Sequence, residues 1–201
     1  MISTPARVGS LFVDLDTPVT PAMAKAFAAA GVAGVFRYLG DVTPSELATI
    51  LDAGLQFSPV NHPRGGSWGQ GTGHDDGILI VRHCDPLSLP AGIHVWVDCE
   101  GQGGSVEDWT GYGSAVCQPI AAAGYLPGAY TGAGVPLSGG QWYSLPFLGY
   151  WESCSIVPRV ATCGPMVQQW HRFNLPFCGA VVDLDFMAPD AKGRVAMVVG
   201  G

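Results

Sequence analysis

Charged residues are scarce in this sequence: Asp, Glu, Lys and Arg make up 12% of its 201 residues, whereas hydrophobic residues make up 48%. Such a composition excludes an intrinsically disordered chain. Basic residues are the scarcer kind, because 9 Lys and Arg stand against 16 Asp and Glu, which gives a net charge of -7. This negative balance argues against nucleic acid and anionic membranes as partners.

Several signatures of other protein classes are missing. No apolar run reaches the roughly 18 residues that a membrane span needs, so we expect no stable insertion into a membrane. Residues 1–10 lack the basic start and apolar stretch of a secretory signal, which predicts synthesis in the cytoplasm.

The cysteines also lack a common motif. They are Cys84, Cys99, Cys117, Cys154, Cys163 and Cys178. No two of them form a C-x-x-C pair, so a zinc site is not expected. Several lie in apolar segments, which predicts buried free thiols; the alternative is a disulfide between Cys154 and Cys163.

Short apolar runs alternate with amphipathic stretches along a chain whose length suits one domain, residues 1–201. The apolar runs predict strands at 10–16, 34–39, 55–61, 93–99, 125–131, 146–152, 166–170 and 179–185. The stretches between them predict helices at 20–30, 43–53, 74–84 and 105–123, with a short one at 136–145 and barely a turn at 159–164. Thr43 and Pro44 mark a helix start, and Glu46 is expected to complete its capping box.

Strands that alternate with helices are typical of parallel βα units. Eight of them predict an α/β fold, a compact (β/α)8 TIM-like barrel with reduced helices in its second half, since the usual barrel has about 250 residues. An open doubly wound sheet is the alternative. Against it, no Gly-rich phosphate fingerprint follows the first strand, which runs into Asp16-Thr17-Pro18.

Three apolar strands carry pairs of acidic residues at positions i and i+2. The pairs are Asp14 with Asp16, Asp98 with Glu100, and Asp183 with Asp185. Side chains alternate along a strand, so the two carboxyl groups of a pair share one face. Burying like charges together is costly, which indicates catalysis or ion binding. The C-terminal ends of barrel strands meet at one mouth, where we expect these carboxyl groups to converge.

Aromatic, amide and basic residues occupy matching strand positions. They are Arg37, Tyr38, Asn61, Tyr130, Trp151, Gln169 and Trp170, and with Asp185 they form the expected substrate-binding set. Carboxyl groups ringed by aromatic side chains suit a sugar polymer, because rings stack on sugars while the acids protonate the leaving oxygen.

Each of these residues also has a simpler interpretation. Trp151 and Trp170 are alternatively core residues, and Arg37 alternatively the counter-ion of a carboxylate. Asp16 and Asp185 alternatively cap the turns that follow them. A divalent metal held by the carboxylates is a further alternative, because hard cations prefer oxygen ligands.

The motifs together resemble the glycoside-hydrolase-like barrels of the DUF1906 type, relatives of the family 25 lysozymes of bacteria and phages. The resemblance spans about residues 10 to 187 and rests on the order of its motifs. These are Leu11-Phe12-Val13-Asp14, Phe36-Arg37-Tyr38-Leu39, Val97-Asp98-Cys99-Glu100, Gln169-Trp170 and Val182-Asp183-Leu184-Asp185-Phe186. At position 185 the lysozymes more often carry asparagine.

The resemblance implies a role for each carboxyl group. Glu100 would be the general acid, and Asp98 would stabilise charge or position a substrate N-acetyl group. Asp14 and Asp183 would complete an acidic floor. The implied protein is a monomeric, cofactor-free muramidase or endolysin that cleaves the glycan strand of peptidoglycan at the bacterial cell wall. The alternatives are a carbohydrate-binding or structural barrel without turnover and a metal-dependent hydrolase.

Overall fold

The computed structural model describes the whole chain except residues 63–67, 102, 156 and 161, and the side chains of residues 171–175. The strands are β1 (Ile2–Pro5), β2 (Leu11–Asp14), β3 (Val32–Tyr38), β4 (Gln56–Asn61), β5 (His94–Cys99), β6 (Leu126–Thr131), β7 (Gly149–Glu152), β8 (Val167–Phe177), β9 (Ala180–Met187) and β10 (Met197–Gly200). The helices are α1 (Pro21–Ala29), α2 (Pro44–Asp52), α3 (Gln70–Cys84), the 3-10 turn η1 (Asp85–Leu87), α4 (Val106–Ala122) and α5 (Gly139–Ser144).

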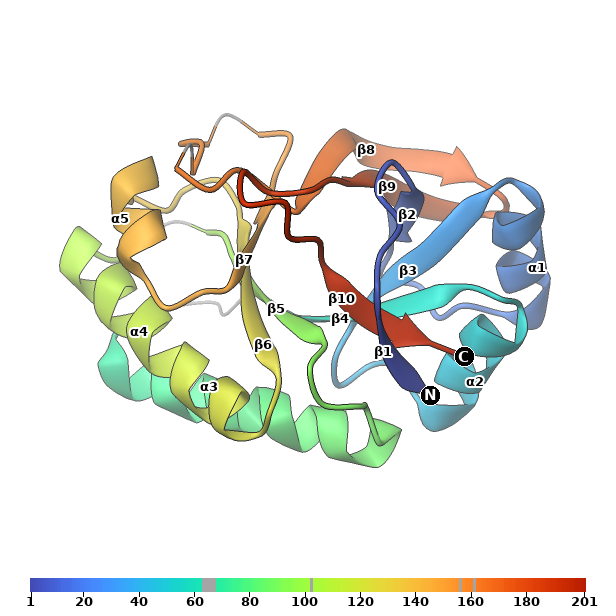
Figure 1. Cartoon of the computed structure of the whole chain (residues 1–201), viewed down its shortest axis with the longest axis horizontal. Helices are drawn as coiled ribbons and strands as arrows, with labels where there is room; N and C mark the ends of the chain where they lie inside the picture. Colours follow the sequence, from blue (N-terminus) through green and yellow to red (C-terminus); the bar gives the residue numbers. More distant parts are fainter. Residues whose placement is uncertain (63–67, 102, 156, 161) are drawn as a thin grey trace.

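Strands β2 to β9 form a closed eight-stranded barrel (Figure 1). The chain of neighbours runs β4-β3-β2-β9-β8-β7-β6-β5, and pairing of β4 with β5 closes the ring. The predicted TIM-like barrel is therefore confirmed, and the open-sheet alternative is wrong. Seven strands are parallel, but β9 is antiparallel to both β8 and β2, so the expectation of eight parallel strands is also wrong.

A tight turn explains the reversed strand. Phe177 pairs with Ala180, which leaves only Cys178 and Gly179 between β8 and β9. Both have positive φ, 52° and 83°, the backbone that type I′ hairpin turns require. A two-residue turn cannot make the crossover that a parallel neighbour needs, so β9 returns along β8.

A small antiparallel pair lies outside the ring. β1 pairs with β10 from Ile2 opposite Gly200 to Pro5 opposite Met197, and β10 meets β4 where Val199 faces Phe57. Sequence reasoning missed both strands, since each has only four residues at a chain end.

Large apolar side chains fill the barrel interior. The inner cluster includes Phe12, Phe36, Trp96, Trp151 and Met187. Two glycines make room for it, Gly34 on β3 beside β2 and Gly128 on β6 beside β5. A Cβ at Gly34 would lie 2.2 Å from the Phe12 ring, and one at Gly128 would lie 2.4 Å from Trp96. Glycine in these strands is thus required by close packing rather than by a turn.

The helices cover the outside of the first strands, and a second hydrophobic cluster lies between helices and barrel. As predicted, the second half carries less helix: α5 has six residues, and the described part of the chain has no helix after it. No described helix is long and apolar enough to cross a membrane. All six cysteines are free thiols, so the alternative disulfide is wrong; Cys154 is exposed and Cys178 partly exposed, contrary to expectation.

A buried ion pair replaces the expected capping box of α2. The Thr43 hydroxyl accepts the Glu46 backbone N–H, as predicted. Oε1 of Glu46, however, accepts from Arg37 Nε at 2.7 Å and from the Val19 backbone N–H at 2.8 Å. Arg37 is fully buried and also donates from Nη1 to the backbone oxygens of Leu15 and Asp16 at 2.9 and 2.8 Å. The pair thus anchors the segment that follows β2.

We predict that Glu46→Gln destabilises the protein by about 3 kcal/mol, because it leaves the buried Arg37 guanidinium without its counter-charge. Unfolding in guanidinium chloride measures the loss. Glu107→Gln, an exposed exchange of the same type on α4, should cost less than about 1 kcal/mol. Equal losses in the two variants would contradict a structural role for the pair.

Candidate active site

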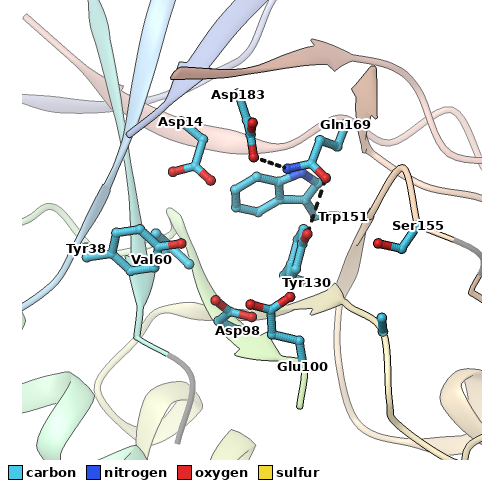
Figure 2. A pocket seen from close by; sticks show the side chains of 11 residues that line it. Asp14, Tyr38, Val60, Asp98, Glu100, Tyr130, Trp151, Ser155, Gln169 and Asp183 are labelled. Carbon is cyan, nitrogen blue, oxygen red and sulfur yellow. Dashed lines mark hydrogen bonds between the residues drawn. The ribbon is translucent and has the colours of Figure 1, made fainter. Parts of the chain in front are cut away.

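A cavity of about 340 Å³ opens where the parallel strands end (Figure 2). It is lined by Asp14, Tyr38, Val60, Asp98, Glu100, Tyr130, Ala133, Trp151, Ser155, Gln169 and Asp183. All four expected catalytic carboxyl groups are among these residues. Of the expected substrate-binding set, the cavity includes Tyr38, Tyr130, Trp151 and Gln169.

Strand geometry brings the four carboxyl groups together. Asp14 ends β2 and lies directly opposite Asp183 of β9. Asp98 in β5 and Glu100 just after it share one face of the strand, and Figure 2 shows both pairs turned toward the space between them. Asp183 reaches the mouth from the first half of its strand, because β9 runs in the reverse direction.

A glycine on the neighbouring strand end makes room for Glu100. A Cβ at position 132 would lie 2.2 Å from the Glu100 Cβ and 2.9 Å from its Oε2. Backbone bonds fix the two strand ends to each other: Gly132 N–H donates to Cys99 at 2.9 Å, and Gly101 N–H donates to Ala133 at 2.9 Å. These backbone hydrogen bonds therefore fix the position of Glu100 at the rim of the barrel, although glycines follow it in the sequence.

Burial among like charges keeps protons on the site. Burial, then Glu100 and Asp14, raise the pKa of Asp98 well above its usual range. Burial, then Asp183 and Asp16, raise the pKa of Asp14 to about 8, against an opposing effect of Arg37. Oδ1 of each has no hydrogen-bond partner among the described residues. The site can thus donate protons near neutral pH, as acid catalysis requires.

Gln169 links the carboxyl group of Asp183 to the hydroxyl group of Tyr130. Its Nε2 donates to Asp183 Oδ2 at 3.1 Å, and its Oε1 accepts from the Tyr130 hydroxyl and the Cys154 backbone N–H, each at 3.3 Å (Figure 2). The side chain is only 4% exposed. With its amide engaged on both sides, Gln169 positions other residues of the site rather than contacting substrate freely.

Two of the expected substrate-binding residues lie in the protein interior, outside the cavity lining. Arg37 is fully buried against Glu46, so the counter-ion interpretation is nearer to the structure, with glutamate as partner. Asp185 is also fully buried and accepts from Trp151 Nε1 at 2.7 Å. It faces Phe12 rather than the rim, so its assignment to substrate or to a turn cap is wrong. Burial and nearby Asp14 raise its pKa well above the usual range.

Trp170 and Asn61 also lie outside the cavity lining, but neither of them is buried. Trp170 is 66% exposed and meets the Phe186 ring edge-on at 5.5 Å, so it is neither core nor cavity wall. The Asn61 side chain donates to the His62 backbone oxygen at 2.8 Å instead of turning inward. Trp151 does line the cavity, but it is 1% exposed and its ring stacks on Phe36 in the barrel interior. Its ring therefore forms the bottom of the cavity.

Sequence reasoning missed part of the cavity lining. Val60, Ala133 and Ser155 carry no chemical signature, and two of them come from loops. The wall behind Tyr38 is also built by contacts that no motif announces: the His62 ring stacks on Tyr38 at 4.2 Å, and its Nε2 lies 2.6 Å from Asp41 Oδ2. In the part of the chain that the structure describes, no three His, Cys, Asp or Glu side chains are grouped to hold a metal ion.

We predict that Asp14→Asn becomes more stable relative to the wild type as pH rises from 4 to 8. The unfolded chain loses the Asp14 proton near pH 3.8 and the folded protein near 8, so the wild type loses stability across this window. The gain in stability at pH 8 should be at least about 1 kcal/mol, the free energy that corresponds to a shift of about one pKa unit. Urea unfolding at pH 4, 6 and 8 measures it. The exposed Asp52→Asn should show no such trend.

We predict that Gln169→Leu costs about 2 kcal/mol of stability, because the buried Tyr130 hydroxyl loses its acceptor and the partly buried Cys154 N–H loses its partner. Thermal and urea unfolding report the change. Gln118→Leu, the same exchange at an exposed position of α4, should stay within about 0.5 kcal/mol. A Gln169→Leu protein as stable as the wild type would show that the bridge is not a structural element.

Solved structures of similar fold include three that differ in how much of their own chain the similarity covers. An uncharacterized protein of B. stearothermophilus has a TM-score of 0.73 at 17% identity, over 89% of this chain and 96% of that one. The Tat-secreted protein Rv2525c of Mycobacterium tuberculosis, in complex with L-tartrate, has 0.71 at 16%, over 94% and 99%. The modular autolysin LytC of Streptococcus pneumoniae, in complex with a synthetic peptidoglycan ligand, has 0.60 at 11%, over 88% and 46%.

At such identities these likenesses show the fold alone. No curated protein matches the sequence. One family model matches residues 25–172, which include β3 to β7 and the carboxyl pair Asp98 and Glu100. That match covers most of the barrel, so the chain belongs to the family described as the Rv2525c-like, glycoside hydrolase-like domain.

Proposed function

We propose that this protein hydrolyses glycosidic bonds in the glycan strand of bacterial peptidoglycan. The observation that carries the proposal is the convergence of Asp14, Asp98, Glu100 and Asp183 on one cavity whose burial holds protons on two of them. Glycosidases need a protonated carboxyl group to release the leaving oxygen and a carboxylate to stabilise positive charge.

Accessibility supports different roles for the two residues of the central pair, Asp98 and Glu100. Asp98 is 3% exposed, whereas Glu100 is only partly buried and stands at the rim, where a polymer can reach it. Glu100 is therefore the proposed general acid. It gives its proton to the glycosidic oxygen as the carbon–oxygen bond breaks, and water then adds to the sugar carbon and returns a proton to the site. Asp98 holds the substrate N-acetyl group while it keeps its proton, and stabilises positive charge as a carboxylate once that proton has passed to Glu100.

The aromatic residues and the shape of the mouth suit a polysaccharide. Tyr38 and Tyr130 border the cavity from opposite sides (Figure 2), as sugar-stacking rings do. A second hollow of about 150 Å³ shares Asp14, Tyr38 and Asp183 with the main cavity, so the acidic floor continues past Asp14. Two adjoining hollows give room for more than one sugar unit.

The comparisons support the choice of substrate. LytC is an autolysin that was solved with a synthetic peptidoglycan ligand, and the Cpl-1 endolysin, with a TM-score of 0.61 at 14% identity, was solved with a peptidoglycan analogue. Rv2525c, similar over almost its whole length, is Tat-secreted. These neighbours support action at the bacterial cell wall. The proposed protein is an endolysin or a related bacteriolytic enzyme that acts as a monomer without a cofactor.

Glu100→Gln should lower the release of fragments from purified peptidoglycan by about 100-fold or more, the size of a general-acid contribution. Mass analysis of the fragments reports both activity and the bond cleaved. Thermal unfolding should be unchanged, and Glu107→Gln should keep full activity because Glu107 is exposed on α4. Full activity of Glu100→Gln would overturn the assignment.

Two other outcomes distinguish the alternative functions. Binding of glycan without any release of reducing ends would indicate a carbohydrate-binding barrel. Loss of activity in EDTA would indicate a metal-dependent hydrolase, whereas a two-carboxylate glycosidase is unaffected by the chelator.

A further inference from the structure

A second cavity lies where the parallel strands begin, at the barrel end opposite the candidate active site. Its volume is about 390 Å³. Its apolar lining comes from Leu126 at the start of β6, Leu148 before β7, Met166 before β8, and Val195 and Met197 around the start of β10. The chain after β9 returns across the molecule to form β10 (red in Figure 1) and closes one side. We call this space the basal cavity.

One buried polar side chain belongs to the lining. His94, the first residue of β5, is 2% exposed, and its Nδ1 accepts the Met197 backbone N–H at 2.9 Å. An Nδ1 that accepts carries no hydrogen, so the neutral ring carries its hydrogen on Nε2. Burial, and then Arg194, lower the pKa of His94 to about 4, so the neutral ring persists at physiological pH.

The Nε2–H group of His94 therefore needs an acceptor that the described residues do not supply. Nε2 is buried without a hydrogen-bond partner among the described residues. An unmatched buried donor costs about 1–3 kcal/mol. The group faces Gly149: a Cβ there would lie 3.0 Å from Nε2 and 2.8 Å from the Met166 sulfur. Because no side chain stands at position 149, the flexible Met166 and the donor both border the space beside Gly149.

The charge at the edge of the basal cavity is already balanced. Arg194 donates from Nε and Nη2 to Oδ2 of Asp190 at 2.8 and 2.7 Å, and Asp190 is 4% exposed. The guanidinium therefore does not require an anionic ligand. What is unmatched in this space is one neutral donor surrounded by apolar surface.

We propose that the basal cavity binds a small, neutral, mainly apolar molecule whose single acceptor oxygen takes the hydrogen bond of His94 Nε2. The volume lies in the range of small-molecule sites, which are apolar with a few placed polar groups. Met166 moves aside to expose the donor, while Leu126 and Leu148 hold the apolar body. The site is independent of the carboxyl groups at the other end of the barrel.

Acetophenone and ethylbenzene test the proposal as probes of similar shape that differ in the acceptor oxygen. Titration into protein with ¹⁵N-labelled histidine should shift the Nε2 resonance of His94 with acetophenone, which should bind about five- to tenfold more tightly than ethylbenzene. Equal binding of both probes would overturn the role of His94. No binding of either, with only water at Nε2, would overturn the site.

Two variants separate the donor from the cavity. In His94→Asn the side-chain oxygen can still accept the Met197 N–H, but the Nε2–H is lost, so acetophenone should lose its advantage over ethylbenzene. Leu148→Trp alters a residue that is 41% exposed and should occlude the cavity, so that neither probe binds, with unchanged thermal unfolding. Undiminished acetophenone binding by folded Leu148→Trp would place the probe elsewhere and contradict the proposal.

Discussion

Closure of the barrel through one antiparallel strand is the constraint on which the candidate active site depends. The Cys178–Gly179 turn sends β9 back along β8, and the far edge of β9 then meets β2. Because β9 runs antiparallel to its neighbours, its two carboxyl groups exchange positions along the barrel axis. Asp183 stands at the mouth opposite Asp14, and Asp185 lies inside, bound to Trp151. In a parallel strand Asp185 would have been the residue nearer the mouth.

The mouth is held by polar groups that position the carboxyl groups without neutralising them. The positive charge of Arg37 lowers the pKa of Asp14, but Arg37 is already bound by Glu46 and by backbone oxygens. Gln169 holds Asp183 through an uncharged amide. The raised pKa values of Asp14 and Asp98 are the consequence. Such an arrangement sacrifices stability for protons held at a cleft, which is a property of functional sites rather than of cores.

Local signals predicted the helices well, because caps act within a few residues. Thr20, Thr43 and Ser105 each cap the helix that was expected to begin there. The predictions failed where a distant residue competes for a side chain. Glu46 accepts from Arg37 and from the Val19 backbone N–H instead of closing its own helix end. The i and i+2 rule placed Asp98 and Glu100 together, since it needs only the strand. It could not say which way Trp170 faces beside a register shift in β8.

The sequence by itself determined the barrel, its first five βα units, and the chemical character of the mouth, because strand periodicity, caps and paired acids are local properties. Only the tertiary structure decided the direction of β9, the burial of Arg37 and Asp185, the role of Gln169 as a bridge, and the unmatched donor of His94. These depend on which strands become neighbours when the ring closes, and on the side chains that then compete for the same hydrogen-bond partners.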